Sequence, residues 1–498
     1  QYNLSGGELS VSSVISINAN GALNQTGGTI SGSGTIANNG SFSYNSTANQ
    51  TLSGVISGAG SVTKDNTGTL TISNHGTYSG ATTILGGTLK LSGNQKRNLA
   101  TSYTVEGASA VLEAANIQVF SAFGSSYDKE LTATNGGTIK ATSVAIRIGD
   151  VTLQNGSRLT ANGVNGTYGG CYIGQLAGGA SPTVTVTGSG ASQIDGIGNM
   201  TLVSTIFDVE DVTGDNAADL TVSLNLQNMT GINFTGNVQI DGAVTKTGAG
   251  TLTLSATNSY TGATTVSAGI LSLGNGTNNT ALDDAADMIV TTGAVVNLNY
   301  TGTDTIDELS LGGALQTPGI WGASGSGATF INDSFFSGGG TLTVTIGPAP
   351  SAYQGWGVGN GLSDADALTT ADPESDGLSN LLEFAFGTDP TVSNGSSIAY
   401  GNGVTPGLPL PVLESITSES VDFRAVFAWR KDWAAAGLTY TVQFSADLTE
   451  WVDSAETPTL LESGSGDIDA VYVDYPMIIE TTAGFEKAQF FRLSVSQD

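Results

Sequence analysis

The chain has 498 residues with 70 Gly, 11 Pro, one Cys and one His, and its 14 Lys and Arg against 43 Asp and Glu give a formal net charge of −29. This charge argues against nucleic acid and anionic membrane surfaces as partners, and favours cation binding or simple solvation. The single Cys171 excludes an internal disulfide, and no apolar run is long enough for a transmembrane helix.

A segment at residues 63–93 returns without a gap at residues 245–275, so that Lys64 reappears as Lys246 and Tyr78 as Tyr260. In each copy, apolar residues such as Leu70 and Ile72 alternate with Thr and Ser, which predicts short strands with one buried face. Glycines separate these strands and mark corners. A repeat at a fixed offset is typical of a solenoid. The sequence therefore predicts an all-β solenoid over residues 1–347.

Residues 1–62 show the same alternation without a capping helix, so we expect their end to be covered by a loop or used for docking. Residues 94–244 are less regular and contain two charged groups. We interpret the acidic group as a solvated loop rather than a metal site, because its spacing is undefined. The basic group is the one worth testing for polysaccharide chemistry. The acidic group is Asp208, Glu210, Asp211, Asp215 and Asp219, and the basic group is Lys129, Lys140, Arg147 and Arg158.

The segments GTLTL, SYTGATTV and AGILSLG of the second copy, and FFSGGGTLTV near residue 340, resemble the autotransporter-associated β-strand repeat of bacterial passenger proteins. This resemblance implies a right-handed parallel β-helix that is secreted or exposed on the bacterial cell surface, and it implies no activity. Gly347–Pro350 then interrupts the pattern, and residues 348–355 are a predicted linker.

Residues 356–390 form a predicted EF-hand-like calcium-binding segment. DPESDGLSNLLE at residues 372–383 fits the twelve-residue calcium loop, with a glycine at its sixth position and a glutamate at its twelfth. The predicted Ca²⁺ ligands are Asp372, Glu374, Asp376, the carbonyl of Leu378, Asn380 directly or through water, and Glu383.

The calcium segment resembles dockerin-like and thrombospondin type-3 modules. Glu374 departs from the usual Asp or Asn, which weakens the site or routes the contact through water. Asp364 and Asp366 precede the loop and could extend it. The competing interpretation is an acidic helix start without an ion, because an Asp is also favourable there.

Residues 391–410 are a predicted second linker, and residues 411–498 alternate with period two and are rich in aromatic residues, which predicts a C-terminal antiparallel β-sandwich. We expect Trp429, Trp433 and Trp451 to pack in its core, although they could also form a platform for stacking sugars.

The sequence shows no catalytic constellation. The only histidine, His75, aligns with Thr257 of the second copy, so we expect neither a catalytic base there nor an enzyme. The leading hypothesis is an extracellular structural rod that serves as a surface, matrix or filament subunit and self-associates head to tail. The alternative is a glycan-binding adhesin, and a polysaccharide-degrading β-helix enzyme comes third.

Overall fold

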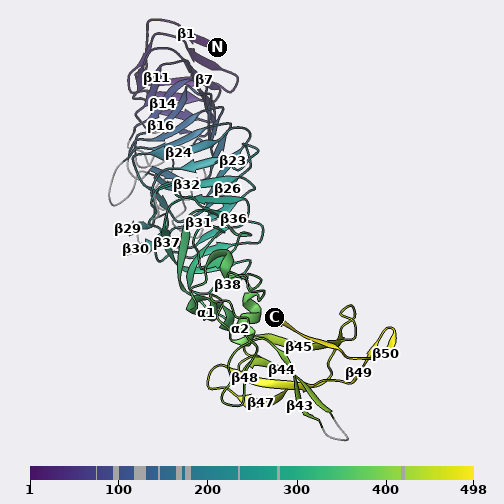
Figure 1. Ribbon diagram of the computed structural model, residues 1–498. Coiled ribbons are helices and arrows are strands. Elements are labelled where there is room, and N and C mark those ends of the chain that lie inside the picture. Colours follow the sequence, from purple (N-terminus) through teal and green to yellow (C-terminus); the bar gives the residue numbers. More distant parts are fainter. Residues whose placement is uncertain are drawn as a thin grey trace. The chain divides into compact units, whose positions relative to one another are not determined.

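The structure is a computed structural model that describes residues 1–74, 76–93, 100–116, 120, 130–143, 146–163, 171–173, 181–233, 236–277, 281–416 and 421–497. It divides into two compact units (Figure 1). The solenoid unit comprises residues 1–326 and 332–348, and the C-terminal unit comprises residues 327–331 and 349–498. His75 and Lys129 lie outside the described residues.

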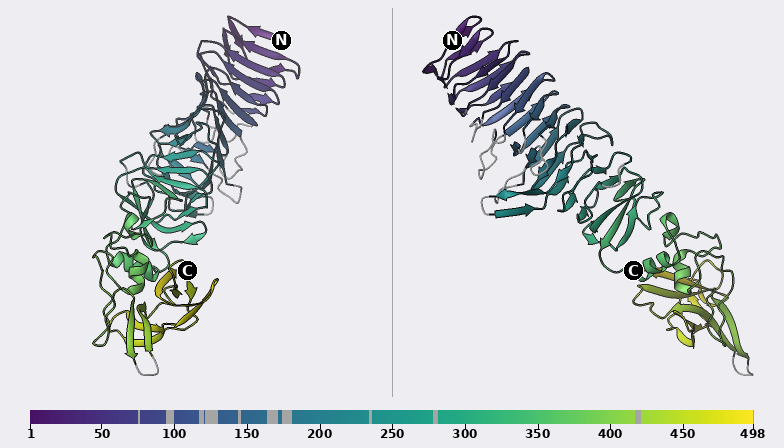
Figure 2. Two further views of the ribbon diagram at one scale, coloured as in Figure 1. Left: turned by 45° about the vertical axis from the view of Figure 1, so that its right-hand side comes forward. Right: turned by 90° about the vertical axis from the view of Figure 1, so that its left-hand side faces the viewer.

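Successive coils of the solenoid unit stack through two long sheets of parallel strands (Figure 2). The strands of the first sheet are β1 (Tyr2–Leu4), β4 (Ala22–Gln25), β7 (Ser41–Asn45), β10 (Ser61–Asp65), β13 (Thr82–Ile84), β15 (Ser102–Glu106), β17 (Glu130–Thr134), β20 (Val151–Gln154), β23 (Thr183–Thr187), β26 (Ser204–Val209), β31 (Ala243–Thr247), β33 (Thr264–Val266), β35 (Met288–Val290), β37 (Thr303–Leu311) and β42 (Thr341–Ile346).

The strands of the second sheet are β8 (Gln50–Leu52), β11 (Thr69–Ile72), β14 (Gly87–Leu91), β16 (Ala110–Ala114), β18 (Thr138–Ala141), β21 (Arg158–Ala161), β24 (Ser192–Gly196), β27 (Leu220–Val222), β32 (Thr251–Leu254), β34 (Ile270–Leu273), β36 (Val295–Leu298) and β41 (Phe336–Gly338).

Shorter parallel ladders close the coils. They comprise β3 (Val14–Ile17), β6 (Thr35–Asn38), β9 (Ile56–Gly58) and β12 (Thr77–Tyr78); β19 (Ile146–Ile148), β22 (Cys171–Ile173), β25 (Met200–Leu202) and β28 (Leu226–Gln227); and β2 (Glu8–Ser10) with β5 (Thr29–Ser31). An antiparallel hairpin of β29 (Met229–Asn233) and β30 (Gly236–Ile240) interrupts the regular winding. These long parallel sheets are those expected of a parallel β-helix; the right-handed winding stays a prediction.

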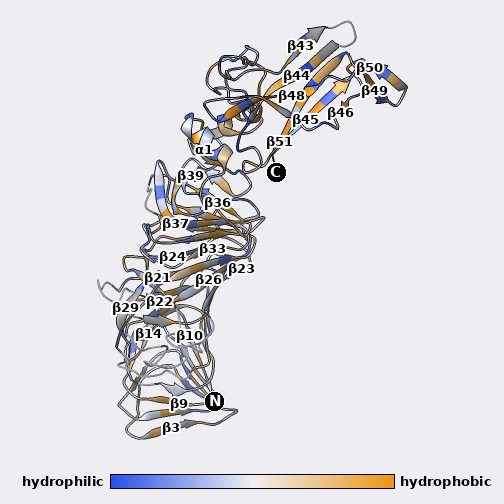
Figure 3. Cartoon of the chain, turned by 90° about the horizontal axis from the view of Figure 1, so that it is seen from below, coloured by the Kyte–Doolittle hydropathy of each residue, from blue (hydrophilic) through white to orange (hydrophobic). Residues whose placement is uncertain are grey.

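In-register apolar residues form the solenoid core. In the second sheet, Leu70, Leu89 and Leu112 follow one another in adjacent strands, and all three side chains are fully buried. Burying such a side chain stabilises the fold by roughly 1.5–3 kcal/mol. Close coil stacking also explains the corner glycines, because a Cβ at Gly54 would lie 2.0 Å from the carbonyl oxygen of Gly34 in the preceding coil. Figure 3 shows how apolar residues concentrate on the strands.

The two ends of the first sheet differ in their strand pairing. At the N-terminal end, β1 pairs with β4 alone among the described strands. At the other end, antiparallel strands close the sheet: β38 (Ala314–Leu315) pairs with β37, and β39 (Gly319–Gly322) pairs with β42. Among the described strands, β1 therefore has a partner on one side, whereas antiparallel strands cover the far end of the sheet.

The C-terminal unit combines short helices with antiparallel sheets. Its elements are β40 (Phe330–Ile331), α1 (Ala352–Gly359), a 3₁₀-helix η1 (Asp364–Ala367) and α2 (Asn380–Phe386); a four-stranded sheet of β43 (Leu410–Ile416), β44 (Val421–Arg430), β48 (Ile468–Asp474) and β47 (Thr459–Ser463); a three-stranded sheet of β46 (Val452–Asp453), β45 (Leu438–Ser445) and β51 (Phe490–Gln497); and the hairpin of β49 (Ile478–Thr481) and β50 (Gly484–Lys487). None of the helices among the described residues is long and apolar enough to cross a membrane.

The C-terminal unit shares one core across the predicted segment boundaries. Phe384 and Phe386 of α2 belong to the same buried cluster as Val426 and Ala428 of β44, and Ile398 of the predicted linker 391–410 joins them. Within the predicted linker 348–355, α1 already begins at Ala352, with a capping box formed by Ser351 and Gln354. Residues of the predicted calcium segment, of the predicted second linker and of the C-terminal antiparallel sheets therefore pack in one core.

Candidate metal centre

The predicted calcium loop brings three of its acidic side chains together. One carboxylate oxygen from each of Asp372, Glu374 and Asp376 lies within 4.8 Å of the other two. Ser375 (φ 59°) and Gly377 (φ 92°) adopt the left-handed conformation that turns the loop back on itself, as predicted for Gly377. Among the described residues, this is the only group of three or more acidic, His or Cys side chains gathered closely enough to hold a metal ion.

Backbone N–H groups fix two of these carboxylates. The Oδ1 and Oδ2 atoms of Asp372 accept hydrogen bonds from the backbone nitrogens of Asp376 (3.1 Å) and Gly377 (2.9 Å). Those of Asp376 accept from the backbone nitrogens of Leu378 (2.8 Å) and Asn394 (2.6 Å). Each carboxylate keeps further lone pairs, so it can hold a cation while its orientation is set by the loop.

Two glutamates of the loop have buried oxygens without hydrogen-bond donors. Neither carboxylate oxygen of Glu374 accepts a hydrogen bond, and Oε2 of the fully buried Glu383 accepts none either. Burial, and after it the neighbouring carboxylate of Glu374, raises the pKa of Glu383 to about 8. Burying an anion without a hydrogen-bond donor or a positive charge beside it raises the free energy of the folded state, and a divalent cation bound between such anions offsets this rise. The hard oxygens of this site suit Ca²⁺.

Asn380 and Leu378 also anchor the loop to its surroundings. The amide nitrogen of Asn380 donates to the carbonyl oxygens of Asp366 (2.6 Å) and Leu368 (2.9 Å), while its Oδ1 is buried and accepts no hydrogen bond. The Leu378 side chain lies in the core of the unit. The Asn380 oxygen is therefore the atom left for an ion, and the rest of its side chain ties the loop to η1. The side chain of Asp364 is outside the described residues.

Asn394 contacts two of the predicted ligands and was not predicted from the sequence. It lies eleven residues after Glu383, in the range predicted to be linker, yet its side-chain nitrogen donates to Oε1 of Glu383 at 3.3 Å. Thr388 donates to the same oxygen at 3.3 Å. The calcium-loop pattern ends at its twelfth residue, so it gives no signal for either contact.

The acidic group in the solenoid unit is a hydrogen-bonded loop. Asp219 is fully buried and accepts hydrogen bonds from the backbone nitrogens of Val212, Thr213 and Thr251 and from the hydroxyl of Thr213. Asp211 and Asp215 accept from backbone nitrogens within their own turn. The expectation of a solvated loop is therefore corrected for two members of the group, because Asp219 is fully buried and Asp208 lies within β26.

Lys64 and Lys246, one in each repeat copy, are completely buried. The ammonium of Lys64 donates to the carbonyl oxygens of Asp65 (2.7 Å), Asn66 (2.7 Å) and Gly86 (2.9 Å), and that of Lys246 makes the equivalent three contacts at 2.7–3.1 Å. Burial lowers the pKa of both side chains to about 8. The alternation with Val62 and Val244 already placed both lysines on the inner face, a signal that the sequence analysis did not use.

The other candidate residues do not converge on a site. Arg158 pairs with Asp195, and Lys140 lies beside Glu113 on the neighbouring strand; the side chain of Arg147 is outside the described residues. Cys171 is buried, and burial raises the pKa of its thiol to about 12, so the thiol is a weak nucleophile.

The three tryptophans separate into two places in the C-terminal unit. Trp429 stacks on Trp433 with ring centroids 5.6 Å apart, while Arg492 covers Trp451. They do not form one platform.

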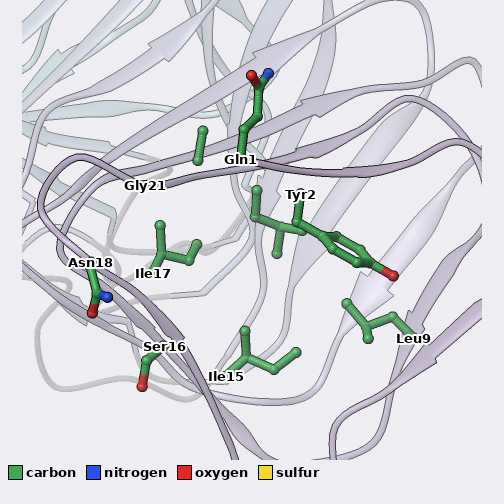
Figure 4. A pocket seen from close by; sticks show the side chains of 10 residues that line it. Gln1, Tyr2, Leu9, Ile15, Ser16, Ile17, Asn18 and Gly21 are labelled. Carbon is green, nitrogen blue, oxygen red and sulfur yellow. The ribbon is translucent and has the colours of Figure 1, made fainter.

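A pocket of about 430 Å³ opens at the N-terminal end of the solenoid (Figure 4). Its lining includes Leu9, Ile15, Ile17 and Leu23, and it is the end of the apolar core seen between the first coils. Of the neighbouring side chains, Tyr2 is half exposed. The pocket gathers no acid–base pair and offers apolar surface instead.

Comparison with family models identifies the two repeat copies. Residues 62–91 and 244–273 each match the passenger-associated-transport-repeat family. Each match spans two successive coils: β10 pairs with β13 and β11 with β14 in the first copy, as β31 pairs with β33 and β32 with β34 in the second. Neither the curated proteins nor the solved structures that were compared gave a match. The repeat coils of the solenoid are therefore similar to those of autotransporter passenger domains.

Proposed function

We propose that this protein is an extracellular, non-enzymatic β-solenoid rod whose C-terminal unit binds Ca²⁺ at residues 372–383. The rod is supported by the two family matches within continuous parallel sheets. Calcium binding is supported chiefly by the buried carboxylate of Glu383, which faces Glu374 with one oxygen lacking any donor. The two parts of the proposal have separate tests.

Calcium would bind the oxygens that the fold has already gathered. Asp372, Glu374, Asp376 and Glu383 supply carboxylates and Asn380 supplies its amide oxygen, while the backbone hydrogen bonds of the loop hold the aspartates in place. The ion contributes positive charge where the carboxylates of Asp372, Glu374 and Asp376 are gathered and that of Glu383 interacts with Glu374. Six to eight hard oxygen ligands are usual for Ca²⁺, so water or the Leu378 carbonyl would complete the set.

Calcium titration of the full chain tests this site. Isothermal titration calorimetry should show one binding site, and peptide-resolved hydrogen exchange should show increased protection in α2 and β44. At a calcium concentration 100-fold above Kd, the C-terminal unit should gain about 2.7 kcal/mol. Asp376→Ala with Glu383→Ala should abolish both responses, and Asp447→Asn, which changes an exposed turn carboxylate of the same unit, should retain them. Wild-type protein without a calcium response would refute the site.

In the proposed structural role, the solenoid acts as a rod that other molecules or further copies of the chain can bind, and it catalyses no reaction. The head-to-tail filament predicted from the sequence needs a free strand edge at both ends of the solenoid. Among the described strands β1 pairs with β4 alone, whereas β38 and β39 cover the other end of the first sheet. Negative-stain microscopy of the purified chain tests the filament: periodic polymers support it, and separate particles at all concentrations reject it while leaving the rod intact.

One observation favours a glycan-binding adhesin as the second candidate. Trp433 is 38% exposed while its ring stacks on Trp429, so one aromatic surface in the C-terminal unit faces solvent. Aromatic faces of this kind stack on sugar rings. Glycan-array binding that is lost in Trp433→Ala would support this role, and an array without signal would remove it.

A further inference from the structure

We propose that Asn394, which lies outside the twelve-residue loop, is the positioning residue that closes the calcium site. This inference rests on the proposed calcium function. It changes the unit of recognition from a single loop to two segments: the loop at residues 372–383 and a clamp at residues 388–394. The clamp supplies orientation, while the loop supplies the ligands.

Asn394 reaches two proposed ligands from two different atoms. Its backbone nitrogen donates to Oδ2 of Asp376 at 2.6 Å, and its side-chain nitrogen donates to Oε1 of Glu383 at 3.3 Å. Asp376 and Glu383 stand at positions 5 and 12 of the loop, which lie on opposite arms of the site. Asn394 therefore joins the two arms with one residue.

The fold of the clamp determines where Asn394 lies. Gly387 (φ 72°) ends α2 in the left-handed conformation, and the backbone nitrogen of Thr388 then donates to the carbonyl of Glu383 at 3.0 Å. Asp389 caps the following turn by accepting from the backbone nitrogen and hydroxyl of Thr391. The Asn394 side-chain nitrogen also donates to the carbonyls of Asp389 (2.7 Å) and Val392 (2.5 Å), so its two hydrogens are shared among three acceptors, of which Oε1 of Glu383 is the most distant. These contacts return the chain to the loop and fix the Asn394 amide.

The hydrogen bonds to Glu383 separate the roles of its two oxygens. Oε1 accepts from Asn394 and Thr388, whereas the buried Oε2 accepts from no donor. The clamp thus holds the carboxylate by one oxygen and leaves the other without a donor. Groups that orient metal ligands in this way typically change metal affinity by about 10–100-fold when they are removed.

The test compares Asn394→Ala with Asn402→Ala in the full chain. Asn402 is an exposed asparagine of the same unit, so its change should leave calcium binding unaltered. For Asn394→Ala we expect Kd for Ca²⁺, measured by calorimetry, to rise about 10–100-fold. Thr388→Val removes the second donor to Oε1 and should raise Kd less.

A purely structural role of Asn394 would give a different pattern. It would lower the melting temperature in EDTA while leaving Kd within about threefold of wild type, and this result overturns the inference. If Asn394→Ala does not fold, Thr388→Val decides: an unchanged Kd rejects the clamp. If the wild-type chain binds no calcium, the proposed function itself is refuted. If the wild-type chain binds calcium and neither variant changes Kd, only the clamp is refuted.

Discussion

Asp219 of the solenoid and Glu383 of the C-terminal unit are both completely buried carboxylates, but only Asp219 has donors for both oxygens. Its two oxygens accept four hydrogen bonds from the strands and turns of neighbouring coils. Glu383 has one oxygen with donors and one without. The solenoid thus satisfies its buried charge internally, whereas the C-terminal unit leaves a place for a cation.

The buried lysines extend this contrast to positive charge. Lys64 and Lys246 each donate to three carbonyl oxygens at a corner between coils. The backbone itself therefore stabilises their buried positive charge. A solenoid has many such corners, where carbonyl groups lack a partner in the next coil. We therefore expect calcium to affect the stability of the C-terminal unit and to leave that of the solenoid unchanged.

The largest effect is expected from Lys64→Ala. This change leaves three carbonyl oxygens without their donor and opens a cavity, so it should destabilise the solenoid by about 3–5 kcal/mol. Chemical denaturation followed by hydrogen exchange in β10, β13 and β14 measures the loss. Lys90→Ala is the matched control, because Lys90 lies on the outer face of the same repeat and pairs with Glu113. Equal stability of the two variants would contradict the role given to Lys64.

In the absence of calcium, a rise in pH should lower the stability of the C-terminal unit through the buried carboxylate of Glu383. The pKa of Glu383 is about 8 in the folded chain and close to 4.5 when the chain is unfolded. Between these values the folded form binds more protons, so stability is fully present below about pH 4.5 and is lost as the pH rises through 8. The expected loss is on the order of 2 kcal/mol.

Calcium should reverse this pH dependence, because the ion binds the ionised carboxylates. Thermal melts in EDTA and in calcium at pH 5 and pH 8, with hydrogen exchange in α2 as the local readout, measure both directions. The Glu383→Gln variant is the control, since it cannot ionise. A wild-type C-terminal unit that becomes more stable from pH 5 to pH 8 in EDTA would disagree with the burial of Glu383.

The sequence predicts the solenoid well because its signals are local and repeated. Alternation places Leu70 and Leu252 inside, and their glycine corners recur at the same offset, so strands and core follow from short windows. Alternation also predicted strands in the C-terminal unit, such as β44 and β48, which pair in the structure. The proposed calcium loop rests on the same kind of local signal, since its ligand spacing is contained in twelve residues.

Contacts between distant segments were not predictable in this way. Asn394 meets Glu383 only because Gly387 and the Asp389 turn bring the chain back, and its own neighbours in sequence resemble a linker. Phe384 joins a core made with β44 and β48, so the predicted boundary at residue 390 divides a single body. These features depend on tertiary packing, for which one sequence carries no periodic signal.

A smaller effect is expected from Asp219→Asn, which tests the satisfied carboxylate directly. The amide replaces one acceptor with a donor that faces a backbone N–H, so the solenoid should lose about 1–3 kcal/mol, with the same value in calcium and in EDTA. Denaturation under both conditions measures this. Asp195→Asn, on the outer face beside Arg158, is the comparison variant and should lower the free energy of unfolding by a smaller amount. A calcium-dependent loss at Asp219 would indicate that the acidic group of the solenoid binds metal after all.

The smallest effect concerns the link between α2 and the antiparallel sheets of the C-terminal unit. The Tyr440 hydroxyl donates to the carbonyl of Ala385 in α2 at 2.8 Å and accepts from the backbone nitrogen of Arg430, whose guanidinium lies over the Phe384 ring. Tyr440→Phe should therefore cost about 1 kcal/mol and reduce calcium-induced protection in β44 and β45, while calcium affinity stays close to wild type. Tyr472→Phe, in β48 of the four-stranded sheet, is the control. If β44 and β45 gain full protection in Tyr440→Phe, the coupling runs through the shared apolar core rather than through this hydroxyl.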